Sequence, residues 1–330
     1  MPNDERAVLV APDSFKGTFR ASEVAAAIGR GLESVVATAP DLMPVADGGE
    51  GTLEVLLVAL GGETAGADAS DALMRPIKAG FGLTEDGGTA IVETANAIGL
   101  PQIKESERDA EAASSYGAGQ LIAAAAASGA ARVIVAVGGS ASTDGGVGAL
   151  EAIESAGGIG TAELIICCDV NTPYELAAEV FGPQKGADPA AVERLTARLE
   201  KTAASLPRDP RGVEMSGCAG GLSGALWAQY GATLEPGARF VLSALDADER
   251  IQAARAVIVG EGRIDRTTFE GKIAAEIAVR ARQAGVPCHA IVGSNGLDAL
   301  DQRILDLQGV IEASTLAEIE QAGSEIAAYL

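Results

Sequence analysis

Residues 132–150 read RVIVAVGGSASTDGGVGAL, which predicts a strand, a glycine-rich loop and a helix in that order. Residues 133–137 are short and mostly β-branched, as in a buried strand. The loop then places hydroxyl groups and Asp144 among four glycines. Glycine lets a backbone approach a ligand closely, and a helix N-terminus offers free N–H groups and a positive dipole end. The stretch favours a phosphate site in which Asp144 holds magnesium, with a plain strand-to-helix turn as the alternative.

The same construction recurs near both ends of the chain. Polar and glycine-rich stretches, PDSFKG at 12–17 and DGGEGT at 47–52, directly follow two apolar runs. Open α/β sheets bind their ligands at the carboxyl ends of strands, so these stretches are candidate ligand loops. We expect helices over 22–36, with Ser22 as N-cap, and over 53–60. The strands expected in this sheet are residues 7–11, 42–46, 256–260, 288–293 and 310–313.

The middle of the chain has a different pattern. Residues 77–83 alternate apolar with small or polar side chains, and residues 89–93 follow a turn at Asp86, so they predict an antiparallel hairpin. An alanine-rich helix is expected over 111–127, and a strand over 164–168.

The fold class is therefore α/β. We expect a doubly wound, Rossmann- or flavodoxin-like parallel-sheet domain made of residues 1–60 and 245–330. A second α/β domain, residues 61–244, is inserted into it.

Composition excludes several functions. The net charge of −22 and the 3% aromatic content argue against binding to nucleic acid or to an anionic membrane. The apolar region 121–137 is interrupted by polar residues, so no membrane span is expected. The four cysteines lack metal-site spacing and no signal peptide is evident, which predicts reduced thiols and a cytoplasmic location. The single histidine, His289, lies in an apolar run and is expected in the core or at a sheet end. The oligomeric state is not predicted.

General nucleotide motifs are missing: the chain has no P-loop, no G-x-G-x-x-G after its first strand and no H-R-D. Six loops taken in order, however, resemble the bacterial glycerate kinases, specifically the two-domain type that makes 2-phosphoglycerate. These loops are APDSFKG at 11–17, PVADGGEGT at 44–52, GGSASTDGG at 138–146, CDV at 168–170, FGPQKGA at 181–187 and GEGRIDRTTFEGK at 260–272.

The resemblance implies phosphorylation of glycerate that depends on ATP and Mg²⁺, and a Rossmann-like domain carrying an insert. Phosphoryl transfer needs cations on the phosphates, a carboxylate-held metal and a group that takes the hydroxyl proton. The candidates for catalysis are Lys16, Asp47, Asp169 and Arg263, with Asp47 and Asp169 both open as the base. Candidates for binding substrate or phosphate are Asp13, Ser14, Ser140, Thr143, Lys185, Glu261, Asp265 and Lys272. Candidates for binding nucleotide are Gly138, Gly139, Gly145, Gly220 and Gly221, and the metal candidate is Asp144. We expect these residues to meet in a cleft between the two domains.

The chain also departs from the family pattern. The segment 151–163 is short, residues 171–180 replace a stretch rich in proline and glycine, and Thr267 stands where glutamine is usual. The substrate could therefore be another small hydroxy acid. A non-catalytic, nucleotide-binding regulator is a further alternative, but it would be expected to have lost the charged loop residues. A dehydrogenase lacks support because the nicotinamide fingerprint is missing.

Overall fold

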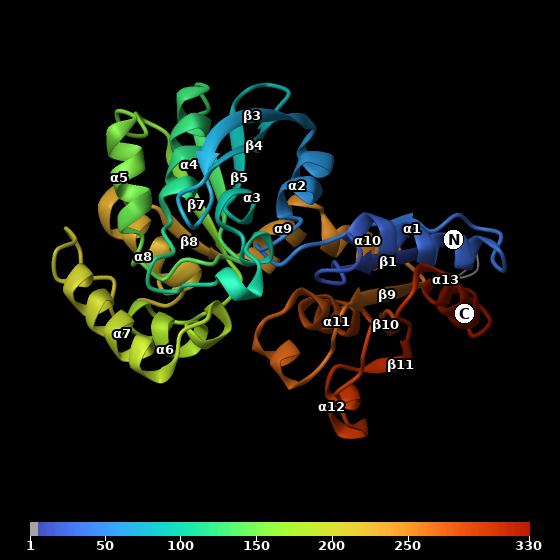
Figure 1. Ribbon diagram of the computed structural model, residues 1–330. Helices are drawn as coiled ribbons and strands as arrows, with labels where there is room; N and C mark the ends of the chain where they lie inside the picture. The colour runs from blue at the N-terminus through green and yellow to red at the C-terminus, as the bar shows by residue number, and fades with distance from the viewer. Residues whose placement is uncertain (1–5) are drawn as a thin grey trace. The chain divides into compact units, whose positions relative to one another are not determined.

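The computed structural model describes residues 6–330. The chain divides into two compact units, which we call unit 1 (Met1–Asp47 with Val241–Leu330) and unit 2 (Gly48–Phe240). Figure 1 shows both units with their helices and strands labelled. Residues 48–60 and 241–244 thus fall on the other side of the boundary from the domain that the sequence predicted. Apart from the assignment of these two segments, the domain limits stay a prediction.

Unit 1 is built on a parallel sheet in the order β11-β10-β9-β1-β2. Its strands are β1 (Val8–Pro12), β2 (Asp41–Leu42), β9 (Ala256–Glu261), β10 (Cys288–Val292) and β11 (Leu307–Glu312). Val8, Val10 and Ile258 pack against α1 (Ala21–Glu33) and α13 (Leu316–Ala327). The alternate residues point to the opposite face, where α11 (Ile273–Ala284) contacts β9 and β10. Helices on both faces confirm the predicted α/β class.

The start of α1 differs from the prediction. Its N-cap is Arg20, whose backbone N–H donates to the Glu23 carboxylate at 2.9 Å. The predicted cap, Ser22, lies inside the first turn.

Unit 2 contains a mixed sheet in the order β3-β4-β5-β6-β7-β8. Its strands are β3 (Gly62–Ser70), β4 (Pro76–Thr84), β5 (Thr89–Glu93), β6 (Arg132–Ala136), β7 (Glu163–Cys168) and β8 (Thr233–Pro236). The antiparallel pairing of β4 with β5 confirms the predicted hairpin. Strand β3 pairs with β4 along its whole length but was not predicted. Its small, largely exposed residues give a weak apolar pattern.

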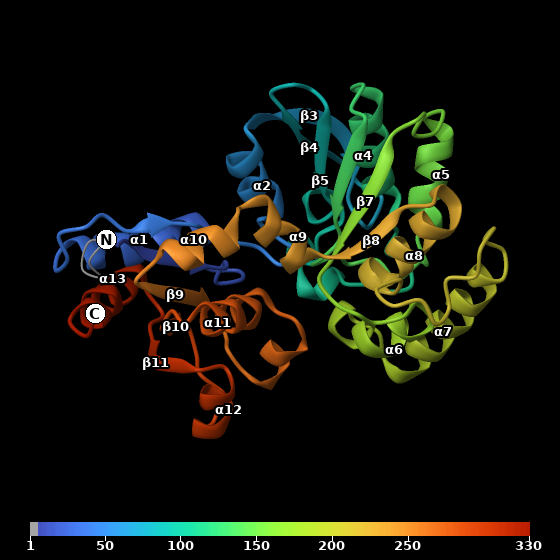
Figure 2. The same ribbon diagram turned by 180° about the vertical axis from the view of Figure 1, so that it is seen from behind.

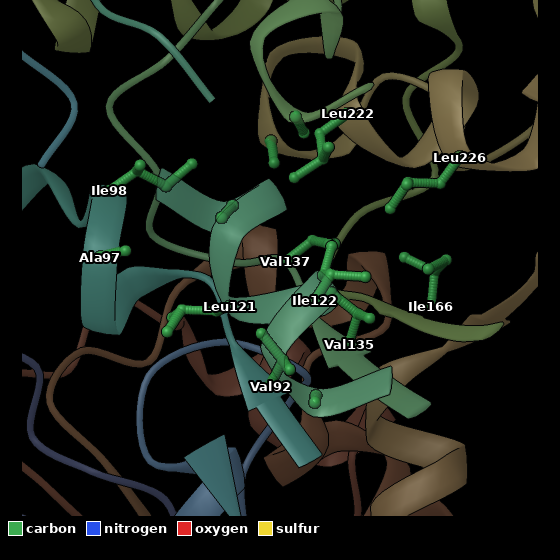
Figure 3. Close-up of a cluster of buried hydrophobic side chains, with 14 of the residues drawn as sticks. Val92, Ala97, Ile98, Leu121, Ile122, Val135, Val137, Ile166, Leu222 and Leu226 are labelled. Carbon is green, nitrogen blue, oxygen red and sulfur yellow. The ribbon is translucent and has the colours of Figure 1, made fainter. Parts of the chain in front are cut away.

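Helices cover the sheet of unit 2. Figure 3 shows side chains of β5, β6 and β7 packed with those of α3 (Ala95–Ile98), α4 (Tyr116–Ala127) and α8 (Cys218–Tyr230). From behind, Figure 2 shows α8 beside β7 and β8, which it contacts. The remaining helices are α2 (Thr52–Leu60), α5 (Val147–Ser155), α6 (Ala177–Phe181), α7 (Pro189–Ala203), α9 (Gly237–Ala244), α10 (Ala247–Ala253) and α12 (Ala299–Ile304).

Helix α2 packs onto strand β4 of unit 2, where a glycine leaves room for it. A Cβ at Gly82 would lie 2.7 Å from a methyl group of Leu53 and 2.9 Å from one of Leu57. The bare backbone of β4 therefore lets the helix pack directly onto the strand.

All four cysteines are free of disulfide bonds, as predicted, and all four are buried. His289 is 9% exposed and is the second residue of β10, which confirms a core position. Between residues 6 and 330, no helix has both the length and the apolar character that a membrane crossing requires.

Candidate functional site

Unit 1 has a cavity of about 390 Å³ at the carboxyl ends of its parallel strands, which we call the Lys16 cavity. Parallel strands end at one edge of a sheet, so loops distant in sequence meet there. Seven of the predicted site residues line it: Asp13, Ser14, Lys16, Asp47, Glu261, Arg263 and Lys272. Asp265 is held next to them by an ion pair with Arg263, at 2.9 Å.

Oppositely charged side chains face one another in the Lys16 cavity. Lys16 Nζ lies 3.2 Å from Asp47 Oδ2, and Lys272 Nζ lies 3.5 Å from Glu261 Oε2. Thr268 Oγ1 also donates to Glu261, at 3.2 Å. Burial raises the pKa of Glu261 although Lys272 opposes the shift. The two lysines thus partly neutralise a carboxylate-rich pocket.

Asp13 is the most perturbed group of this cavity. Burial, and next the negative charge of Asp47, raise the pKa of Asp13 to about 8 from the ordinary 3.8. Lys16 opposes this shift, as does the Ser14 N–H, which donates to Asp13 Oδ1 at 2.6 Å. At pH 7 the Asp13 carboxyl therefore carries a proton in the unliganded protein.

In unit 2, Asp144 anchors its own loop to two helices. Its Oδ2 accepts hydrogen bonds from Ser115 N at 2.8 Å, Ser115 Oγ at 2.9 Å, Gly148 N at 3.2 Å and Ser114 Oγ at 3.4 Å. Its Oδ1 accepts from Gly146 N at 3.0 Å. These bonds satisfy both carboxylate oxygens with protein donors. The predicted metal role of Asp144 stays a prediction, and the geometry favours a structural role.

The metal question extends beyond Asp144. Within residues 6–330, no group of three or more His, Cys, Asp or Glu side chains is arranged to hold a metal ion.

Lys185 is buried against the loop of residues 138–146. Its Nζ donates to Ser142 O at 2.6 Å and lies 3.5 Å from Ser140 Oγ. Burial lowers the pKa of Lys185 to about 8 from 10.5, and the charges of Asp169 and Asp144 oppose the shift. The side chain of Asp169 lies close to the same loop. A Cβ atom added to Gly138 would be only 2.9 Å from Asp169 Oδ2. Unit 2 thus brings Lys185, Asp169 and the loop together.

The predicted nucleotide-binding glycines divide into two kinds. Gly138 and Gly139 begin the loop, and Gly139 is exposed with a φ of +75°. Gly145 and Gly221 instead pack against the buried Tyr174, and Gly220 packs against the backbone of Ser142 and Thr143. Tyr174 Oη donates to Gly145 O at 2.9 Å.

A Cβ at Gly221 would lie 2.7 Å from the Tyr174 ring, and Gly145 N donates to Gly220 O at 3.0 Å. Gly220 and Gly221 also have left-handed backbones, with φ of +65° and +96°. Close packing explains this second group without any ligand.

The sequence reasoning missed several residues of both sites. Phe15, Thr18, Gly262, Gly293, Ser294 and Ser314 also line the Lys16 cavity. The rule that located Asp13 could have found Ser294 and Ser314, since they follow β10 and β11 directly. Nothing local in the sequence connects Ser115 or Tyr174 with the loop, because those contacts join residues 29 positions apart.

Comparisons with known proteins give a consistent result. The Glycerate kinase family profile matches residues 8–157 and 154–328. A glycerate kinase of Haemophilus influenzae is 37% identical over 86% of this chain and 85% of its own, and a glycerate 2-kinase of Escherichia coli is 34% identical over 87% and 85%. A crystal structure of a candidate glycerate kinase 2 from Salmonella typhimurium LT2 superposes with a TM-score of 0.80 at 30% identity, covering 98% of both chains.

The hydrogen bonds of Asp144 predict the behaviour of Asp144→Asn. The amide group would face N–H donors that the carboxylate now satisfies, and each lost bond of this kind costs about 1–3 kcal/mol. We expect the variant to melt at least about 3 °C lower than the wild type, with no recovery at high Mg²⁺. Thermal unfolding scans and turnover at increasing Mg²⁺ test this. An unchanged Tm with activity restored by Mg²⁺ would instead identify Asp144 as a metal ligand.

The pKa of Asp13 predicts that Asp13→Asn stabilises the unliganded protein. Between pH about 4 and about 8 the folded state keeps a proton that the unfolded state has released, so stability falls with rising pH across this window. Asparagine removes this penalty and can still accept the Ser14 hydrogen bond. The variant should melt several degrees above the wild type at pH 8, and the difference should vanish near pH 4. Equal Tm values at pH 8, or a gap that widens toward pH 4, would contradict the burial of an ionisable Asp13.

Proposed function

The chain belongs to the glycerate kinase family, and from this premise we propose that it transfers the γ-phosphoryl group of ATP to the 2-hydroxyl of glycerate. The products are 2-phosphoglycerate and ADP. The observation that carries the proposal is the Lys16 cavity, where Lys16, Lys272 and Arg263 line a pocket of about 390 Å³ together with a protonated Asp13. Three cations suit a small acid that becomes a phosphate ester, despite the net charge of −22.

We assign the acid to unit 1. Lys16 is held by its ion pair with Asp47 and Lys272 by its ion pair with Glu261, so an incoming glycerate carboxylate finds cations already held in place. Burial raises the pKa of Asp13 to about 8, which suits a group that exchanges a proton with the acceptor hydroxyl near neutral pH. Asp47 keeps Lys16 in position and remains the second candidate for the base.

We assign the triphosphate to the loop that begins at Gly138 in unit 2. The exposed Gly139 leaves the backbone accessible, and Lys185 lies against the same loop with Asp169 close by. A magnesium ion held here would supply positive charge that offsets the charge of the phosphates. Asp169 is the carboxylate of unit 2 that we propose would hold it, since magnesium usually takes one or two protein carboxylates together with the substrate phosphates.

The remaining proposals follow the family. The four unpaired cysteines support a cytoplasmic location. The partners are the small molecules glycerate and ATP.

Turnover is the first test of this function. We expect ADP release with D-glycerate and MgATP, and 2-phosphoglycerate as the product, in an assay that couples ADP to NADH oxidation and reads the product by ³¹P NMR. A panel of other small hydroxy acids serves as the specificity control. Activity with a different acid but not with glycerate would show that the proposed substrate is wrong. 3-Phosphoglycerate as the sole product would show that the proposed regiochemistry is wrong. No ADP release with any acid would contradict the proposed kinase activity.

Charge removal at the two assigned positions is the second test. Lys16→Ala and Asp169→Ala should each lower kcat/KM by at least about a hundredfold, because each removes one preorganised group from the reaction. Lys201→Ala is the matched control, an exposed lysine on α7 that should keep the wild-type rate. A near-wild-type kcat/KM for either site variant, with circular dichroism unchanged, removes that residue from the mechanism.

A further inference from the structure

Unit 1 contains a second cavity, of about 620 Å³, at the other end of the strands that form the Lys16 cavity. Arg255 directly precedes β9 and His289 is the second residue of β10, and both line this second cavity. The Lys16 cavity is lined by Glu261, the last residue of β9, and by Gly293, which follows β10. Six residues of β9 span about 20 Å, so the two cavities are separate. We call the second one the Arg255 cavity.

The guanidinium of Arg255 is incompletely paired. Its Nε and Nη2 are buried, and among residues 6–330 neither has a hydrogen-bond partner. Buried donors of a charged group are costly to leave unsatisfied. Both atoms have almost no exposed surface, so an anion in the cavity that Arg255 lines would satisfy them once the side chain turns toward it. Nε with an Nη is the edge on which arginine binds a carboxylate or phosphate through two parallel bonds.

The strands beside Arg255 are shaped to keep the cavity open. The register of β10 with β11 shifts between Cys288 and His289, so Gln308 is an extra residue on β11 and lines the cavity. Such bulges redirect side chains and are common beside functional sites. Gly309 is the next residue, and a Cβ atom added to it would lie 3.5 Å from His289 Nδ1.

Helix α13 supplies the other wall, and Figures 1 and 2 show it and the C-terminus beside the strands of unit 1. Ile326 and Leu330 give this wall apolar surface. Glu325 adds a negative charge, which opposes a doubly charged ligand such as a phosphate monoester. The volume is in the range of pockets for small organic molecules.

We propose that the Arg255 cavity binds a small organic monocarboxylate. Its carboxylate pairs with the Arg255 guanidinium, and its apolar body packs against α13 and β11. This site is independent of the proposed glycerate kinase reaction, since none of its lining residues borders the Lys16 cavity.

The single histidine of the chain makes this testable without labels on the ligand. His289 lines the cavity, so its Cε1–H resonance is the only imidazole signal of untagged protein and reports on occupancy. Benzoate and hexanoate are the carboxylate probes. Benzyl alcohol tests whether an uncharged ring alone binds, and inorganic phosphate and phenyl phosphate test whether a phosphate group binds in place of a carboxylate. We expect a saturable shift with both carboxylates, at a dissociation constant of about 1–10 mM for molecules this small. The other three compounds should shift the signal at least tenfold more weakly.

Three variants separate the proposal from nonspecific effects. Arg255→Gln should abolish the carboxylate shift, whereas Arg30→Gln, which removes the same charge from the exposed Arg30–Glu320 pair, should preserve it. Gly309→Val should also abolish the shift by filling the space beside His289, with the charge unchanged. All three should keep glycerate turnover, which verifies the fold. No saturable shift with either carboxylate, a shift that persists in Arg255→Gln, or stronger binding of either phosphate compound would overturn the proposal.

Discussion

The desolvation of Asp13 beside Asp47 is the constraint on which the Lys16 cavity depends. Two strand ends, β1 and the segment after β2, bring these carboxyls together where water cannot solvate both charges. Lys16 compensates in part through its 3.2 Å contact with Asp47, and Lys272 does the same for Glu261. The proton on Asp13 relieves the remaining repulsion, so the unliganded pocket has a protonated acid next to fixed cations. Such an arrangement lowers stability, and the parallel sheet, with helices on both faces, maintains it.

The second unit solves a similar problem with hydrogen bonds in place of ion pairs. Asp144 holds the glycine loop through five donors, and Tyr174 holds the next residue through Gly145 O. A loop held in this way can present backbone groups to phosphate without reorganising. Lys185 is buried against it with a lowered pKa, so the charge of this lysine is also sensitive to its neighbours near neutral pH.

Much of this could be read from the sequence, for a physical reason. Apolar runs ending in polar and glycine-rich loops mark the carboxyl ends of parallel strands, and this located Asp13, Ser14, Lys16 and Asp47. The other three predicted residues of the Lys16 cavity came from the resemblance to the glycerate kinases. Long-range packing was not readable in this way. Strand β3 lacks an apolar pattern, α2 packs onto β4 because Gly82 admits Leu53, and the hydrogen bonds from Ser115 to Asp144 were not expected. Each of these depends on a neighbour distant in sequence, which no local pattern encodes.

The most direct measurement is the ionisation of Asp13 itself. In protein labelled with ¹³C at aspartate Cγ, comparison with Asp13→Asn assigns the Asp13 carboxyl resonance, which can then be followed against pH in the absence of substrate. Burial next to Asp47 predicts a midpoint near pH 8. A midpoint below pH about 5 would mean that Asp13 is solvated and ionised like an ordinary aspartate, which would contradict the electrostatic account of the cavity.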